Sequence, residues 1–198
     1  SDLSEKTIVD AMEDKKERYI DTITNDKNDW YAIRLYTTKQ EEVAQFFTEK
    51  GIETFIPKQY VAEEDKQGRV HQKLKPVVRN LLFVKKTMED TDFKRLVYES
   101  NFKMSVLTKT EDNSKYSLIP HDQMYEFRLM CNPDVHIRKF ISAEEARLKA
   151  GDAVLVKFGP LKGMTGRLVR SSKKYYLLKE IPGIGVMLKV SRWCCVPQ

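Results

Sequence analysis

The last fifty residues carry strand signals only, and no other part of the chain constrains the fold as strongly. After Gly151, short segments rich in branched and aromatic residues follow one another, separated by GPLKGMT, SSK, PGI and Arg192. The segments are DAVLVKF, GRLVRS, KYYLLKEI, GVMLKVS and WCCV. Strands this short leave exposed edges unless their sheet closes on itself. Residues 149–198 are therefore predicted to form a small β-barrel.

A glycine-rich loop, VKFGPLKGMTGRLV at residues 156–169, joins the first two of these strands. A phosphate-binding loop would need the spacing GxxxxGK[ST], whereas Lys162 precedes its glycine and the RLVR that follows is a strand rather than a helix. Nucleotide binding is therefore not expected here. Gly159, Gly163 and Gly166 are interpreted as a corner that permits positive φ angles and a close approach of two crossing strands.

Residues 30–131 mix strand and helix patterns and predict a separate α+β domain. The expected strands are WYAIRLY, IETFIPKQYVAEE, VVRNLLFVKK and KMSVLTK, and the expected helices are TTKQEEVAQFFTEKG, EDTDFKRLVYES and IPHDQMYEFRLMC. The first helix is expected to have a threonine cap and to stop at Gly51, and a turn is expected at Gly68. The order β, α, β, β, α, β, α is typical of a split βαβ sheet covered by helices.

Two further segments complete the division of the chain. Residues 132–148 contain Pro133 and mixed charges, and they are interpreted as a linker with a short helical turn at SAEEARL. Residues 1–29 form an acidic N-terminal extension with nine acids and five bases. This extension is expected to be disordered or marginal, or else an amphipathic helix that needs a partner surface.

The charge of +6 is distributed unevenly along the chain. The extension has a net charge of −4, whereas residues 149–198 hold ten bases and two acids, a net of +8. Opposite charge at this density predicts a transient contact of the extension with the barrel or with a regulator. The barrel interleaves basic and aromatic residues: Lys173, Lys174, Tyr175, Tyr176, Arg192 and Trp193. They fit a nucleic-acid surface, or equally aromatics that fill the barrel and lysines that keep it in solution.

Residues for catalysis or metal binding do not converge in the sequence. His71, His121 and His136 share no ligand spacing, and Cys194 and Cys195 are neighbours that point to opposite faces of a strand. Three cysteines also argue against a disulfide framework. We expect no enzyme activity, no metal and no cofactor. No apolar run approaches the ~20 residues of a membrane helix, and no secretory signal begins the chain, so a cytoplasmic protein with no membrane contact is expected.

These segments together resemble a known family. GDAVLVKFGPLKGMTGRLVR resembles the KOW motif, with Gly166 at the motif's glycine. WY at 30–31, the helix after it, IETFIPKQ, and RNLLFV at 79–84 resemble the NGN domain of NusG-type transcription elongation factors. IPHDQMYEFRLM and FGPLKGMTGRLV are similar to specialised paralogues of the UpxY type, related to RfaH. The resemblance implies an NGN-type α/β sandwich followed by a small SH3-like KOW β-barrel.

The resemblance also implies a function. A bacterial protein of this kind binds the clamp helices of the largest RNA polymerase subunit as a monomer and suppresses pausing and termination, for UpxY-type proteins in polysaccharide operons. The alternative is a KOW-based RNA- or ribosome-binding protein that acts without polymerase. The preceding NGN pattern favours the first interpretation, since a ribosomal KOW protein would not need it.

Site residues follow from the resemblance position by position. The clamp contact is expected at Val78, Leu81 and Phe83. Contacts with non-template DNA or nascent RNA are expected from the resemblance at Arg34, Tyr36 and Lys39, and the basic and aromatic pattern of the barrel adds Lys173 and Lys174 as candidates. A partner loop for a ribosomal protein, Rho or a dedicated regulator is expected at Ile181, Pro182 and Ile184.

Overall fold

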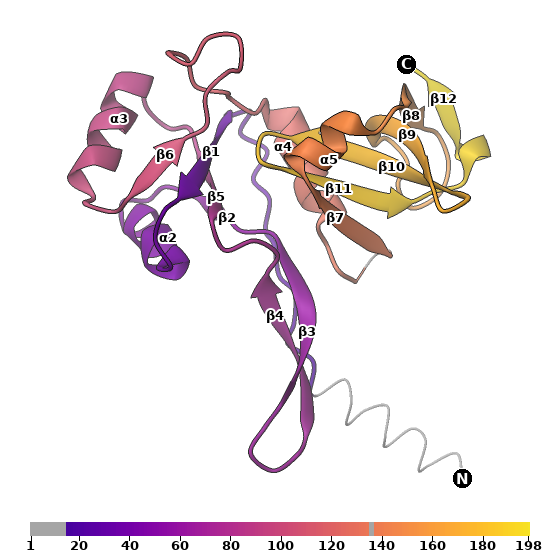
Figure 1. Ribbon diagram of the computed structural model, residues 1–198, viewed down its shortest axis with the longest axis horizontal. Coiled ribbons are helices and arrows are strands. Elements are labelled where there is room, and N and C mark those ends of the chain that lie inside the picture. The colour runs from indigo at the N-terminus through magenta and orange to yellow at the C-terminus, as the bar shows by residue number, and fades with distance from the viewer. Residues whose placement is uncertain (1–14, 135–136) are drawn as a thin grey trace.

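The computed structural model describes residues 15–134 and 137–198. Figure 1 shows two lobes side by side and a long two-stranded hairpin that projects away from both. The N-terminal lobe (residues 15–134) is built on a four-stranded sheet, and the C-terminal lobe (residues 137–198) on a six-stranded one. The mixed α and β content agrees with the predicted fold class.

The sheet of the N-terminal lobe has the order β2-β5-β1-β6. Its central strands, β1 (Trp30–Leu35) and β5 (Leu81–Lys85), pair antiparallel, and β6 (Met104–Val106) and β2 (Thr54–Phe55) form the edges. Alternate residues of β1 enter two different cores, Tyr31 and Ile33 one of them, Trp30 and Ala32 the other. Both faces are covered, which explains why β1 and β5 are almost continuously apolar.

Helices cover the two faces of this sheet. α2 (Gln40–Glu49) and α3 (Asp90–Glu99) pack on one face, where Phe93 stacks on Tyr31 with ring centroids 4.1 Å apart. α4 (His121–Met130) packs on the other. All three helices lie where the sequence predicts them, and the first reverses at Gly51 with φ of 75°. The expected threonine cap is absent, because α2 begins after Lys39 and the Thr37 hydroxyl accepts a bond from the Lys39 amide.

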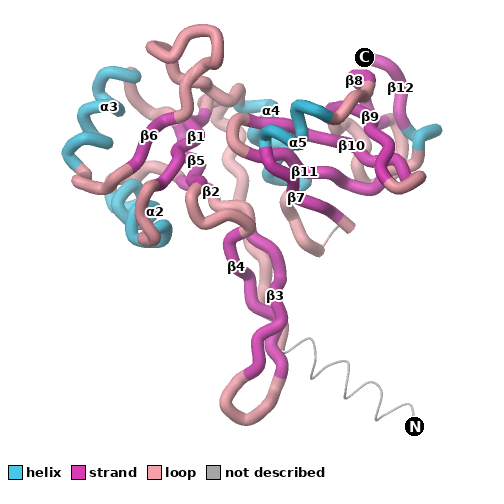
Figure 2. Tube along the Cα trace, in the orientation of Figure 1, coloured by secondary structure: helices cyan, strands magenta, loops and turns pink. Residues whose placement is uncertain are grey.

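The prediction of one strand over IETFIPKQYVAEE is wrong. The chain leaves the sheet after β2 and forms β3 (Lys58–Glu64), which pairs with β4 (Val70–Pro76) in the projecting hairpin of Figure 2. The break falls at Pro57, which has no amide to donate to a sheet. VVRNLLFVKK is likewise a strand only at Leu81–Lys85, because its first residues connect the hairpin to the sheet.

The C-terminal lobe contains the five predicted strands and one more. They are β8 (Asp152–Val156), β9 (Thr165–Ser171), β10 (Lys174–Ile181), β11 (Ile184–Lys189) and β12 (Cys195–Pro197), the last preceded by a 3-10 turn, Arg192–Cys194. β7 (Arg138–Ser142) adds to this sheet beside β11, giving the antiparallel order β12-β8-β9-β10-β11-β7. β7 and β12 lie at the two ends of this order, and a closed KOW barrel stays a prediction.

The expected linker, residues 132–148, holds more regular structure than predicted. The short helix appears as α5 (Ala143–Leu148), but β7 before it belongs to the C-terminal sheet rather than to a connection. Its Arg138 and Lys139 break the apolar alternation that marks the other strands. The exact domain boundaries therefore stay a prediction.

The glycine corner has the geometry expected of it. Gly159 and Gly163 have φ of 88° and 92°, in the left-handed region. A Cβ atom at Gly166 would lie 2.5 Å from the Leu178 carbonyl oxygen, so β9 and β10 cross there with no room for a side chain.

Candidate functional site

The residues expected to contact polymerase lie where the two lobes meet. Leu81 and Phe83 are buried and Val78 is half-buried. The Phe83 ring packs in the core between Phe55 and Phe127, with centroids 6.5 Å and 5.8 Å away. The Phe83 side chain is therefore enclosed by residues of the N-terminal lobe, whereas the Leu81 side chain is in contact with the C-terminal lobe.

The cover over Leu81 is the tip of the β10–β11 hairpin. Gly183, at the tip, has φ of 96°, and a Cβ atom built on it would lie 2.8 Å from the Leu81 Cδ1 and 3.5 Å from the Leu107 Cδ1. Backbone thus touches the Leu81 side chain directly, an approach that glycine alone permits. Ile181 and Ile184 flank this tip and are buried.

Two predicted binding surfaces therefore cover each other. The tip that contacts Leu81 carries Ile181, Pro182 and Ile184, the residues expected to form the partner loop. A pocket of about 440 Å³ remains beside the contact, and its walls come from both lobes. It is lined by Arg34, Val77, Val78, Asn80, Leu81, Phe140, Ile141, Ser142, Glu144, Gly183 and Ile184.

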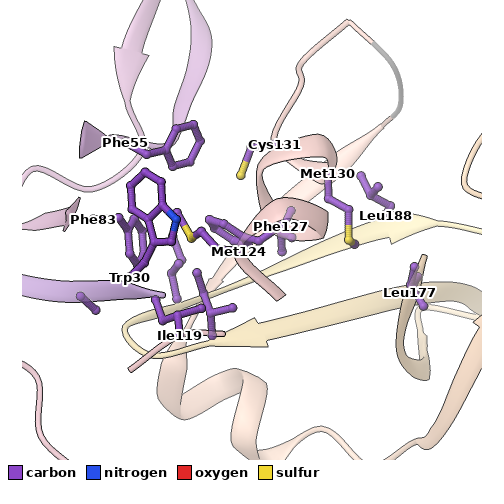
Figure 3. Packing of buried hydrophobic residues seen from close by; sticks show 14 of the residues in the cluster. Trp30, Phe55, Phe83, Ile119, Met124, Phe127, Met130, Cys131, Leu177 and Leu188 are labelled. Atoms are coloured by element: carbon purple, nitrogen blue, oxygen red, sulfur yellow. The ribbon is translucent and has the colours of Figure 1, made fainter. Parts of the chain in front are cut away.

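α4 provides the larger part of the junction. Figure 3 shows Trp30, Phe55 and Phe83 gathered near one part of α4, while Met130 lies beside Leu188 of the C-terminal lobe. These residues belong to one continuous apolar cluster that spans the two lobes. The lobes therefore share a core in this structure.

A buried ion pair crosses the same junction. Lys179 on β10 is 2% exposed, and its ammonium lies 2.9 Å from a Glu126 carboxylate oxygen on α4. It also donates to Gln123 and Thr165, and the Thr165 amide donates to Glu126 over 2.7 Å. Burial lowers the pKa of Lys179 and Glu126 opposes this shift. We refer to Lys179, Glu126, Gln123 and Thr165 as the junction network.

Reasoning from the sequence missed the residues of this network and one other. Lys179 stands among the ten bases of the tail, and its signal was a lysine inside the apolar run KYYLLKEI. Gln40, buried at the start of α2, donates from one amide nitrogen to the carbonyls of Val78 and Leu81, over 3.0 Å and 2.8 Å. It fixes the backbone of the expected clamp contact.

The expected nucleic-acid residues fall into two separate groups. Tyr36 and Lys39 are exposed just after β1, and Arg34 lines the pocket between the lobes. Lys173 and Lys174 lie in and after the β9–β10 turn, at the opposite end of the eight-residue β10 from the tip that covers Leu81. At about 3.3 Å per residue these two ends are well over 20 Å apart, so the C-terminal group is not part of the junction.

The N-terminal extension is packed on its own lobe over the part that the structure describes, residues 15–29. The Glu17 amide donates to the Gln72 carbonyl of the hairpin over 2.9 Å, and the Glu17 carboxylate accepts from the Leu74 amide over 2.7 Å. Asp21 forms a paired hydrogen bond with the buried Arg128 guanidinium. Residues 15–29 are therefore held against their own lobe rather than free. The amphipathic pattern before residue 15 lies outside the described residues.

No metal or membrane element is found among residues 15–134 and 137–198. These residues contain no group of three histidine, cysteine or acidic side chains that could hold a metal ion. Within the same ranges, no helix has the length and apolar character to cross a membrane. Cys131, Cys194 and Cys195 are free thiols.

Comparison with known proteins agrees with the N-terminal lobe. The family described as "Transcription termination factor nusG" matches residues 28–128, just over half of the chain. A comparison with curated proteins finds no match. The NusG family consists of non-catalytic transcription factors, and its matched region contains the sheet, α2, α3 and nearly all of α4. The chain belongs to the NusG family.

Proposed function

We propose that this protein is a non-catalytic transcription elongation factor that binds the clamp helices of the largest RNA polymerase subunit through its N-terminal lobe. It suppresses pausing and termination by stabilising the elongating conformation of the polymerase. The UpxY-like segments make it an operon-specific antiterminator of polysaccharide biosynthesis genes in a bacterial cytoplasm. It acts as a monomer and needs no cofactor.

The observation that carries this proposal is the apolar surface around Leu81. Within the N-terminal lobe this surface is fixed by Gln40, and the Gly183 tip of the C-terminal lobe lies directly against Leu81. An apolar contact made by a hairpin tip can be exchanged for a contact with a helix pair. Polymerase binding at Leu81 then requires the C-terminal lobe to move aside, which frees Ile181, Pro182 and Ile184 for a ribosomal protein, Rho or a regulator.

Capture of RNA polymerase by the tagged full-length protein tests the proposal. The intact chain is expected to recover polymerase from a lysate of its host, and Leu81→Asp and Val78→Asp are expected to reduce recovery at least tenfold, because a carboxylate enters an apolar contact. Phe83 is left unchanged, since its substitution would damage the core. Tyr98→Asp, at an 84% exposed position on α3, is the matched control and should recover polymerase normally.

The result that would overturn the proposal is equally specific. If neither the intact chain nor a variant with separated lobes recovers polymerase, the N-terminal lobe is not a polymerase-binding domain. If Leu81→Asp and Tyr98→Asp reduce the recovery of polymerase equally, the polymerase contact does not lie at Leu81. Circular dichroism of each variant confirms that a lost interaction is not a lost fold.

A second candidate function has its own support. Residues 149–198 carry a net charge of +8, at the upper end of the range that keeps a small domain in solution. The C-terminal lobe is therefore a candidate for binding RNA or a ribosome independently of polymerase. Ribosome sedimentation of the Leu81→Asp variant separates the two functions, because only the second survives that substitution.

A further inference from the structure

The end of the C-terminal lobe farthest from the junction carries two large exposed rings. Phe158 is 59% exposed and Trp193 is 76% exposed, and their ring centroids lie 6.2 Å apart. A hydrogen bond of 2.8 Å from the Lys157 amide to the Cys194 carbonyl joins the two loops that carry them. The two rings are therefore held as a pair by the backbone and remain open to solvent.

A third ring extends this surface. Tyr175, at the start of β10, has two guanidinium groups near its ring, with Arg170 5.6 Å and Arg192 5.8 Å from the ring centroid. Arg192 directly precedes Trp193, so it connects the Tyr175 ring to the exposed pair along the chain. We refer to Phe158, Trp193, Tyr175, Arg170 and Arg192 as the distal aromatic surface.

Positive charge surrounds the distal aromatic surface without matching acids. The only acids of residues 149–198 are Asp152 and Glu180. Glu180 is bound to Arg167 over 2.8 Å near the opposite end of β10, and Asp152 begins the strand that Phe158 follows. Lys173 sits nearby in a turn where it and Ser172 have φ of 65° and 50°, a conformation usually left to Asn-Gly.

We propose that the distal aromatic surface binds single-stranded nucleic acid. Unpaired bases stack on Trp193 and Phe158, and the flanking phosphates lie against Arg192, Arg170 and Lys173. The net charge of +8 over residues 149–198 favours a phosphate backbone over a protein as the occupant of this surface. Paired bases of a duplex cannot reach the rings, so an unpaired strand is required.

The surface distinguishes neither ribose from deoxyribose nor one base from another. It offers ring faces and cations, and stacking and phosphate attraction are both tolerant of sequence. RNA and DNA single strands of equal length should therefore bind with similar affinity. The site is independent of the proposed polymerase contact. Its two loops follow β8 and precede β12, which Figure 1 shows at the end of the C-terminal lobe away from the N-terminal lobe, and both rings are exposed while the lobes are joined.

Tryptophan fluorescence of the full chain gives a direct test. The chain has two tryptophans, of which Trp30 is 2% exposed and Trp193 is on the proposed surface. Twelve-nucleotide oligo(U) and oligo(dT) should quench the Trp193 emission, whereas a DNA duplex of that length should not. In Trp193→Phe the remaining Trp30 emission should be unaffected by either strand.

Affinities come from the anisotropy of labelled oligonucleotides at several salt concentrations, without polymerase. Trp193→Ala and Phe158→Ala should each weaken binding about tenfold. Arg192→Gln should weaken it and reduce the slope of log K against log salt by about one. Tyr98→Ala and Arg95→Gln, an exposed ring and an exposed guanidinium on α3, are the matched controls and should change nothing.

Several results would overturn the inference. The inference is wrong if neither single strand binds at low salt, or if the duplex binds as tightly as the single strands. It is also wrong if the surface variants and the α3 controls lose affinity equally. A normally folded Trp193→Ala variant with unchanged affinity would assign the surface to a protein partner instead. Trp193→Ala should capture polymerase normally. Loss of the single-strand binding result would therefore leave the proposed polymerase function intact, and loss of polymerase capture would leave single-strand binding intact.

Discussion

At the scale of single residues, buried charges attach the N-terminal segment to its lobe. Lys85 at the end of β5 is buried and pairs with the carboxylates of Asp26 and Glu53. Arg128 is buried between Asp21 and Glu53 and lies over the rings of Trp30 and Phe55. A buried cation that loses its carboxylate partner strongly destabilises the folded protein. Because Asp21 and Asp26 are partners of Arg128 and Lys85, they hold residues 15–29 against the lobe.

The Asp26 carboxylate makes this attachment dependent on pH. Partial burial acts to raise the pKa of Asp26, but the hydrogen bond and charge of Lys85 outweigh it and hold that pKa below its usual value. A carboxyl with a lowered folded-state pKa stabilises the fold above its unfolded pKa and loses this contribution as pH falls through the folded value. The contribution of Asp26 should therefore be complete at pH 6, begin to fall at about pH 4, and be lost as the pH falls through the lowered folded-state pKa.

Thermal unfolding between pH 6 and pH 3 measures this effect. Asp26→Asn should lower the Tm at pH 6, and the difference from the wild type should shrink steadily as the pH falls from 4 to 3. Asp92→Asn, a carboxylate on the exposed side of α3, should track the wild type at every pH. A constant Tm difference between Asp26→Asn and the wild type across this range would contradict the assignment.

At the scale of elements, the sequence predicts what is periodic. α3, α4 and β10 follow from regular apolar spacing, and these elements bury one face or both. The β3–β4 hairpin projects from the lobe and buries little, so its sequence carries no clear alternation. Leu81 and the 181–184 tip were each identified by resemblance, but their contact joins residues a hundred positions apart, and no local pattern encodes it.

The tip of the β10–β11 hairpin allows a clean test of that contact. Gly183→Asn keeps a residue that tolerates positive φ and adds a side chain where the Leu81 Cδ1 lies 2.8 Å from the Cβ position. The tip should be pushed off Leu81, and small-angle scattering should show a larger radius of gyration. Gly163→Asn is the matched control, since Gly163 also has positive φ but nothing within 4 Å of its Cβ position. Equal expansion in both variants would show that backbone strain, not the Leu81 contact, is responsible.

At the scale of the whole molecule, the junction network sets how firmly the lobes stay together. Lys179→Met leaves the Glu126 carboxylate buried without its cation, and Glu126→Gln leaves the Lys179 ammonium without its anion. A buried charge without a partner costs about 3–5 kcal/mol, and separation of the lobes returns it to water. Each single variant should therefore shift the molecule towards separated lobes.

The double variant Lys179→Met with Glu126→Gln should reverse that shift. No charge is left to bury, and the amide oxygen introduced by Glu126→Gln can still accept from the Thr165 amide, so the joined arrangement should recover to wild-type level or beyond. Scattering measures the arrangement directly, and polymerase capture should rise in each single variant and fall back in the double. If the increase in radius of gyration of the double variant equals the sum of the two single increases, the ion pair does not control the junction. The shared apolar core of α4 then holds the lobes together without it.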